Sequence, residues 1–290
     1  MTDPPVPAVP PAGLPAVLLS TASVFPEPTT AAFAAAADLG YDGVELMVQT
    51  DPVSQDGDRI AALSEHYGVP VGAVHSPCLL ITARVWGTDP LVKLSRSIDL
   101  AERVGADVVV VHPPFLWQRA AAGSFTAAVA ELQRRTDVRI AVENMFPLWM
   151  GGQPVNSYRP HWNPVSEPHR WFTLDVSHTA VSRTDVMGLA RQMAGRLAHV
   201  HLADGTGAGR DEHLVPGRGD QPAGELLEAL AGLGFAGAVA VEVSTRGRSH
   251  AERELDLAEA LSFARLHLSR TPVPFPGAEP GVSAPRPATD

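Results

Sequence analysis

Short apolar runs alternate with longer segments of helical periodicity along most of the chain. The short runs are rich in Val, Ile and Leu, which is typical of strands buried on both faces of a parallel sheet. Several of the longer segments are followed by Gly, the residue that most readily forms a left-handed helix cap. The pattern predicts eight strands, at 17–20, 43–47, 71–75, 107–112, 139–143, 172–175, 198–202 and 238–243, and helices at 30–39, 58–67, 90–104, 125–134, 186–194, 223–233 and 250–266.

Eight strands that alternate with helices indicate an α/β fold, a (β/α)8 TIM barrel in a single domain. An open doubly wound sheet also alternates strands and helices, but residues 16–270 match the usual barrel length of about 250 residues. The two ends of the chain, 1–15 and 271–290, are dense in Pro, Ala and Gly and carry no apolar periodicity. We expect both ends to be disordered tails.

Six of the predicted strands end on a side chain that can bind a metal ion. In a barrel of parallel strands every carboxyl end opens on the same face, so we expect these side chains to converge on one pocket. This pattern indicates an enzyme with a metal site. The six residues are His75, His112, Glu143, Asp175, His201 and Glu242.

Charge and cysteine content narrow the class of protein. The formal net charge is −10, which disfavours a nucleic-acid partner without ruling one out, because phosphate binding usually requires a basic face. The single cysteine, Cys78, cannot form an internal disulfide and is expected to act as a small buried apolar residue. No secretory signal and no apolar segment long enough to span a bilayer is present, so we expect a cytoplasmic protein with no membrane partner and leave its oligomeric state open.

Three further motifs accompany the strand-terminal residues. They are D-x-x-H at 175–178, H-x-x-D at 201–204 and D-x-H at 211–213, and the segment YDGVELMV covers 41–48. In this combination the chain resembles the xylose isomerase-like barrel superfamily, which includes sugar isomerases, epimerases and endonuclease IV. The resemblance covers about residues 17–266, and YDGVELMV resembles the second strand of the sugar phosphate isomerase and epimerase branch.

The resemblance implies two metal arrangements. In the single-metal isomerases and epimerases two carboxylates, an aspartate and a histidine hold one divalent ion, and these match Glu143, Asp175, His201 and Glu242. Endonuclease IV holds three zinc ions with additional ligands, which match His75, His112, His178, Asp211 and His213. These five residues could instead bind substrate. The implied cofactor is a divalent metal (Mn, Mg, Co or Zn), with no nucleotide cofactor.

The first functional hypothesis is a metal-dependent isomerase or epimerase acting on a sugar, a sugar phosphate or a polyol-derived keto compound. Glu143 and Glu242 would exchange a proton at the carbon beside a carbonyl. The alternative is a phosphodiesterase of endonuclease IV type with a trinuclear zinc site. The acidic charge and the second-strand segment favour the isomerase and a small carbohydrate-like substrate.

Several other residues receive expectations from their positions. The long segment 145–171 is expected to form a lid or binding element. Asn144 and Asp204 are expected to orient the ligands, Glu45 to reach the pocket or to pair structurally, and His199 to face the helix layer. The residues expected to bind substrate are Arg218, Trp117 and Trp149.

Overall fold

A computed structural model describes residues 13–270, and its central feature is a closed barrel of eight parallel strands. The strands are hydrogen-bonded in the order β1-β10-β9-β8-β5-β4-β3-β2. The predicted fold class is therefore confirmed. The barrel strands are β1 (Ala16–Ser20), β2 (Gly43–Met47), β3 (Val71–His75), β4 (Val108–Val111), β5 (Arg139–Glu143), β8 (Trp171–Asp175), β9 (Leu197–Leu202) and β10 (Ala238–Val241).

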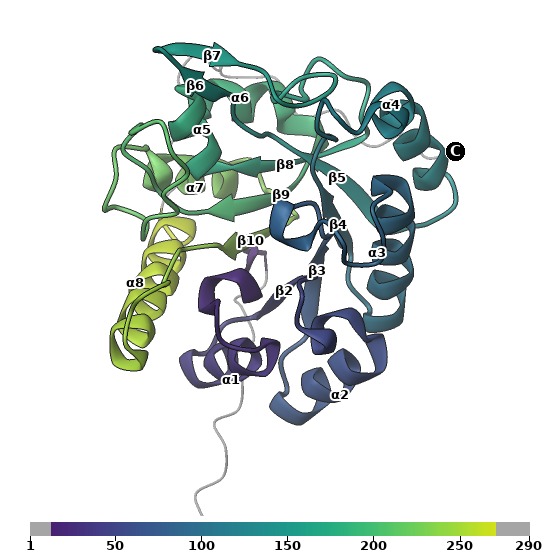
Figure 1. Ribbon diagram of the computed structural model, residues 1–290. Helices are drawn as coiled ribbons and strands as arrows, with labels where there is room; N and C mark the ends of the chain where they lie inside the picture. The colour runs from purple at the N-terminus through teal and green to yellow at the C-terminus, as the bar shows by residue number, and fades with distance from the viewer. Residues whose placement is uncertain (1–12, 271–290) are drawn as a thin grey trace, which may run out of the picture.

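Helices surround the barrel as an outer layer (Figure 1). They bury their apolar sides on the outward-facing Val, Ile and Leu side chains of the strands, which form one continuous core. The α-helices are α1 (Thr29–Leu39), α2 (Gly57–Tyr67), α3 (Pro90–Val104), α4 (Arg119–Gln133), α5 (Val176–Ser182), α6 (Val186–Met193), α7 (Ala223–Gly232) and α8 (His250–Leu268). Short 3-10 helices lie at Thr21–Val24, Pro52–Gln55, Leu80–Thr82 and Ala194–Arg196.

Helix α5, the two short strands of an antiparallel pair and the four 3-10 helices were not predicted from the sequence. Helix α5 starts at once after β8, so its residues look like a continuation of the strand; it forms because the Asp175 carboxylate accepts the backbone N–H of His178 as an N-cap. The antiparallel pair β6 (Leu148–Met150) and β7 (Gln153–Val155) lies within the long segment predicted as a lid. Helix α4 also begins six residues before its predicted start, at Arg119.

The amino end of the barrel is closed by Leu18. A Cβ added at Gly72 would lie 2.8 Å from Leu18 Cδ1, and one at Gly43 would lie 3.0 Å from Leu18 Cδ2. Glycine at these two positions makes room for the leucine. Small side chains such as Ala73 and Ala141 complete this inner cluster with Leu18. This end is therefore apolar and filled.

The predicted tails lie outside the described residues, apart from residues 13–15. Within residues 13–270, none of the helices has the length and apolar character that a bilayer-spanning helix needs.

Candidate active site

His201, the last inward-facing histidine of β9, is the centre of the site. Its Nδ1 lies 3.1 Å from Glu143 Oε1, 3.5 Å from Asp175 Oδ2 and 2.9 Å from Glu242 Oε2. The three carboxylates come from the ends of β5, β8 and β10. The structure thus brings together around one atom the four residues that the sequence predicts as ligands of a single metal ion.

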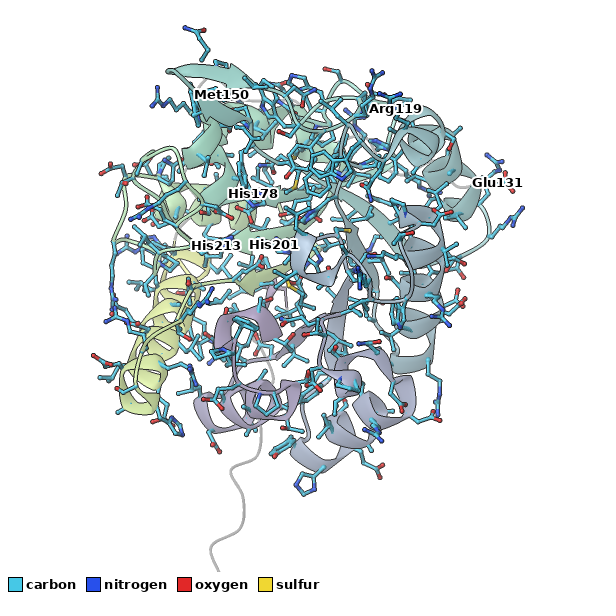
Figure 2. The ribbon with its side chains drawn as sticks, viewed as in Figure 1. Arg119, Glu131, Met150, His178, His201 and His213 are labelled. Carbon is cyan, nitrogen blue, oxygen red and sulfur yellow. The ribbon has the colours of Figure 1, made fainter. Side chains whose placement is uncertain are left out.

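The remaining five predicted ligands surround this centre. His75 and His112, from the ends of β3 and β4, lie with their Nε2 atoms 3.2 Å apart and 3.4 and 2.9 Å from Glu143 Oε2. On the opposite side His178 Nε2 lies 3.4 Å from Asp211 Oδ2, and His213 Nε2 lies 2.8 Å from the same atom. In Figure 2 His178, His201 and His213 lie close together near the middle of the molecule.

Backbone carbonyls fix the orientation of three of these imidazole rings. His75 Nδ1 lies 2.9 Å from the carbonyl of Ser76, His178 Nδ1 lies 2.8 Å from that of Asn144, and His213 Nδ1 lies 2.7 Å from that of Glu242. Since a carbonyl oxygen can only accept, each Nδ1 must donate its proton, and each Nε2 faces the carboxylates. Such a bond on the far nitrogen is the usual way in which proteins orient a metal-binding histidine.

The side chain of Glu45, from β2, orients His201 by accepting a hydrogen bond from the ring nitrogen that faces away from the three carboxylates. Its Oε2 accepts from His201 Nε2 at 2.9 Å and from His199 Nε2 at 2.8 Å, and all three side chains are fully buried. The expectation that His199 faces the helix layer is wrong. Residues two apart in a strand point to the same face, so His199 lies inside the barrel with His201. Glu45 therefore contributes to the site through its hydrogen bond to His201, one of the predicted metal ligands.

Asn144 and Asp204 organise the backbone around the site. The Asn144 side chain accepts from Asp175 N at 2.8 Å and donates to Asp175 O at 3.1 Å, which fixes the end of β8. Asp204 accepts from the backbone N–H groups of Gly217 and Gly219 at 2.9 and 3.0 Å, and within residues 13–270 none of its side-chain hydrogen bonds goes to a predicted ligand. It therefore folds the loop that carries Asp211 and His213.

No motif in the sequence singled out Ser177, which connects α5 to the D-x-H loop. Its hydroxyl donates to Asp211 Oδ1 at 2.7 Å and accepts from the backbone N–H of His213 at 3.1 Å. His213 itself has a left-handed backbone, with a φ of 44°. These contacts hold Asp211 and His213 over the site, on the same side as His178.

Charges in the site favour a bound cation. Burial alone lowers the pKa of His201, but Glu45 and Glu242 raise it well above its ordinary value. Burial also lowers the pKa of His213, and Asp211 overrides this and raises it to about 10. The pKa of His112 stays lowered, mainly by burial. Burial also lowers the pKa of the adjacent His75, but Glu143 outweighs it, so this pKa is raised. An arrangement of carboxylates that stabilises protonated imidazoles also stabilises a divalent cation.

The donor atoms fit such a cation. Asp175 Oδ2 is buried, has no hydrogen-bond partner among the described residues, and points to the region around His201 Nδ1. Four groups of three residues each place their ligand atoms within 4.8 Å of one another, and one of them is Glu45, His199 and His201. The other three groups overlap below the cavity and are His75, Glu143 and His201; Asp175, His201 and Glu242; and Asp175, His178 and His213. Carboxylate oxygens and imidazole nitrogens suit Mn²⁺, Co²⁺ and Zn²⁺.

A cavity of about 510 Å³ opens above these ligands. Its floor contains seven of the nine predicted ligands, and its walls are mostly apolar. The wall residues are Ala22, Met47, Leu79, Leu80, Ile81, Phe115, Met145, Phe146, Leu148, Tyr158, Val243 and Ser244.

The three residues expected to bind substrate lie outside this wall. Trp117 is exposed and stacks on Phe115, with 4.3 Å between the ring centroids. Trp149 donates its Nε1–H to the carbonyl of Val181 at 2.8 Å and packs in the β6–β7 hairpin. Arg218 pairs with Asp256 at 2.7 Å and with Glu259, both on α8. The structure brings none of the three side chains to the cavity.

Cys78 is a free, partly buried cysteine beside the site. Its sulfur accepts the backbone N–H of His112 at 3.5 Å, and burial raises the pKa of its thiol to about 11. The neighbouring Lys93 donates to the carbonyls of Pro77, Thr82 and Ala83, at 2.8 to 3.1 Å. Lys93 therefore fixes the loop that carries Leu79, Leu80 and Ile81, a role that the sequence did not reveal.

Known proteins are similar to this chain in sequence or in fold. An uncharacterized protein of Mycobacterium tuberculosis is 51% identical over 272 residues, 87% of this chain and 97% of that protein. Fructoselysine 3-epimerase of Shigella flexneri is 23% identical, over 75% of this chain and 86% of that enzyme. The crystal structure of an AP endonuclease, family 2, from Brucella melitensis superposes with a TM-score of 0.63 at 19% identity, over 84% of this chain and 97% of the other. The family described as xylose isomerase-like TIM barrel matches residues 33–267, and the chain belongs to this family.

Proposed function

We propose that the protein is a divalent-metal-dependent isomerase or epimerase that moves a proton at a carbon next to a carbonyl. The observation that carries the proposal is the position of Glu143 and Glu242. Their carboxylates lie 3.1 and 2.9 Å from the same atom, His201 Nδ1, and come from strands on different sides of the barrel. The similarity to fructoselysine 3-epimerase supports the same class of reaction.

Glu143, Asp175, His201 and Glu242 would hold the ion. Bound there, a divalent cation would polarise a carbonyl and an adjacent hydroxyl of the substrate. Glu242 lies at the cavity edge with its side chain 11% exposed, and it would take the proton from the carbon. Glu143, buried among His75, His112 and His201, would return a proton that it receives from the imidazole of His75 or His112, 3.4 and 2.9 Å from its Oε2. The proton on Glu242 would then leave to solvent at the cavity edge. The apolar walls would keep bulk water from the carbanion-like carbon.

Proton exchange tests this proposal directly. The metal-loaded protein is incubated in heavy water with a panel of ketoses, sugar acids and aryl-substituted hydroxy ketones, and deuterium incorporation is followed by NMR. We expect incorporation at the carbon beside the carbonyl, lost in both Glu143→Gln and Glu242→Gln. Absence of exchange across the panel, with the metal bound, contradicts the proposal.

A second candidate function is phosphodiester hydrolysis at a multinuclear zinc site. It is favoured by the three overlapping donor groups, which involve His75, His178 and His213 in addition to the single-metal set. It ranks second because no Lys or Arg lies among the described residues that line the cavity, so neither an ammonium nor a guanidinium group would meet phosphates there.

Metal stoichiometry and a nuclease assay separate the two functions. One ion per chain supports the isomerase, and three zinc ions support the hydrolase. If the wild-type protein binds more than one ion per chain, the double variant Asp211→Asn/His213→Gln should bind fewer ions, while the ion at Glu143 and Glu242 remains. Efficient cleavage of duplex DNA at an abasic site, with zinc supplied and without exchange on the sugar panel, would favour the second function.

A further inference from the structure

The walls of the cavity carry very few polar groups. Among the twelve wall residues only Tyr158 and Ser244 have a side-chain hydroxyl, and none is charged. Met47, Met145, Phe115 and Phe146 instead present carbon and sulfur to the space above the ligands. A free sugar has a hydroxyl on almost every carbon, and each hydroxyl buried without a partner costs about 1–3 kcal/mol. Such a wall therefore suits only part of a sugar-like substrate.

The apolar surface continues from the cavity to its rim. Leu80 and Ile81, in the loop after β3, are each 64% exposed, and Leu148, at the start of the β6–β7 hairpin, is 53% exposed. All three line the cavity. Exposed leucine and isoleucine side chains that gather at one cavity are a feature of ligand-binding sites.

Aromatic rings form one side of this wall. Phe115 stacks between Trp117 and Tyr158, with ring centroids 4.3 and 5.0 Å away. Phe146 lies on the other side, 4.8 Å from the ring of His178. Because aromatic pairs also pack edge to face, these rings can contact a substrate ring between the floor and the rim even where their faces are covered.

The volume is sufficient for such a group. A cavity of about 150 Å³ holds a benzene molecule, so 510 Å³ accommodates a ring together with an oxygen-bearing head group. The head group would reach the His and carboxylate floor, and the ring would lie against Phe115, Phe146 and Leu80.

We infer that the substrate is amphipathic: an oxygen-rich head bound at the metal ligands, joined to a ring-sized apolar group that fills the walls of the cavity. The inference rests on the proposed function in one respect, that the floor holds a metal ion. It goes further by assigning the apolar wall to an aryl or comparable group of the substrate, so a free sugar is a poor ligand.

Two metal-chelating probes that differ by a ring test this inference. Acetohydroxamate and benzohydroxamate are titrated into the Mn²⁺-loaded protein by calorimetry. Burial of the ring should make benzohydroxamate bind roughly 10- to 100-fold more tightly. Leu80→Asn/Leu148→Asn should reduce this ratio several-fold and leave the affinity for acetohydroxamate unchanged. The control is Leu255→Asn, since Leu255 is 69% exposed on α8, away from the cavity, and should keep the full ratio.

A second measurement needs no metal and separates the inference from the proposed function. Wild-type protein should broaden the ¹⁹F NMR line of 4-fluorobenzyl alcohol, and Leu80→Asn/Leu148→Asn should not. If the protein binds no metal but still broadens this line, the proposed function fails and the apolar subsite stands. Metal binding without any preference for the ring overturns the inference. It is also overturned if sedimentation shows a dimer of the wild-type protein that Leu80→Asn/Leu148→Asn dissociates, because these side chains would then join two copies of the chain.

Discussion

The two ends of the barrel have opposite chemistry although the same eight strands form both. At the amino end Leu18 fills the interior against Gly43 and Gly72. At the carboxyl end the inward positions are His and carboxylate residues, and buried acceptors such as Asp175 Oδ2 have no hydrogen-bond partner among the described residues. The difference indicates that the packing that stabilises the barrel lies at its amino end and the candidate active site at its carboxyl end, as is usual for this fold.

Glu242→Gln should have the largest effect, because it changes the functional end alone. It removes a proposed base and a metal ligand without changing side-chain volume, so proton exchange should fall by roughly 10²- to 10⁴-fold. Thermal unfolding should remain cooperative, with a similar midpoint. Glu252→Gln, on the outer helix α8, is the control and should retain exchange. Full activity of Glu242→Gln with metal bound would remove Glu242 from the mechanism.

Leu18→Ala should have the converse effect, on stability alone. Leu18 is 2% exposed, and the residues around it are too small to fill the space that it would leave. The free energy of unfolding should fall by about 2–5 kcal/mol, as measured by urea denaturation. Metal content and exchange rate per folded molecule should be unchanged. A loss of metal affinity in this variant would mean that the two ends are coupled.

Much of this division could be predicted from the sequence. Six of the buried apolar runs end at a side chain that can bind a metal, and this placed Glu143, Asp175 and His201 at one site. The same pattern could not reveal what fixes the histidines, since the carbonyls that accept from them become adjacent only when the barrel closes. His178, for example, donates to the carbonyl of Asn144, thirty-four residues earlier.

Arginine and tryptophan positions were harder to predict for a similar reason. Arg218 follows a strand and can reach the open face, but its partner Glu259 lies forty-one residues later on α8. Trp149 is held by a carbonyl of α5, a helix that the apolar pattern did not predict. Long polar and aromatic side chains choose among several partners, and only the folded chain decides between them.

Glu45→Gln examines the layer between the two ends. Glu45 accepts hydrogen bonds from both His199 and His201. Burial raises the pKa of its carboxyl, but the two histidines outweigh burial and hold this pKa well below the usual range. Loss of this charge should weaken metal binding roughly 10- to 100-fold, measured by competition with a chelator. Glu228→Gln is a matched control, because Glu228 accepts from His267 at 2.7 Å between the outer helices α7 and α8. Unchanged metal affinity in Glu45→Gln would show that metal binding at His201 does not depend on the Glu45 carboxylate.

The smallest expected effect concerns His169, a buried histidine just before β8 at the amino end. Both of its ring nitrogens lack hydrogen-bond partners among the described residues. Burial lowers its pKa to about 4, with a further contribution from Arg196, and the other charged groups beside it are Arg134 and Arg170. Among the described residues that line the adjacent cavity there is no carboxylate to stabilise a protonated ring, in contrast to the surroundings of the histidines at the carboxyl end.

The sign of the pH effect follows from this lowered pKa. In the unfolded chain His169 titrates near its ordinary value of 6.5, so between pH 6.5 and 4 the unfolded state binds more protons and stability falls as the pH falls. From pH 6.5 to 5.5 the loss should be about 1 kcal/mol. The measurement is urea unfolding at both pH values for wild type and His169→Gln, whose difference isolates this residue from the carboxylates and histidines of the site. An identical pH dependence in the two proteins would mean that the folded state accommodates a protonated His169, and the amino end would then be less strictly apolar than its packing indicates.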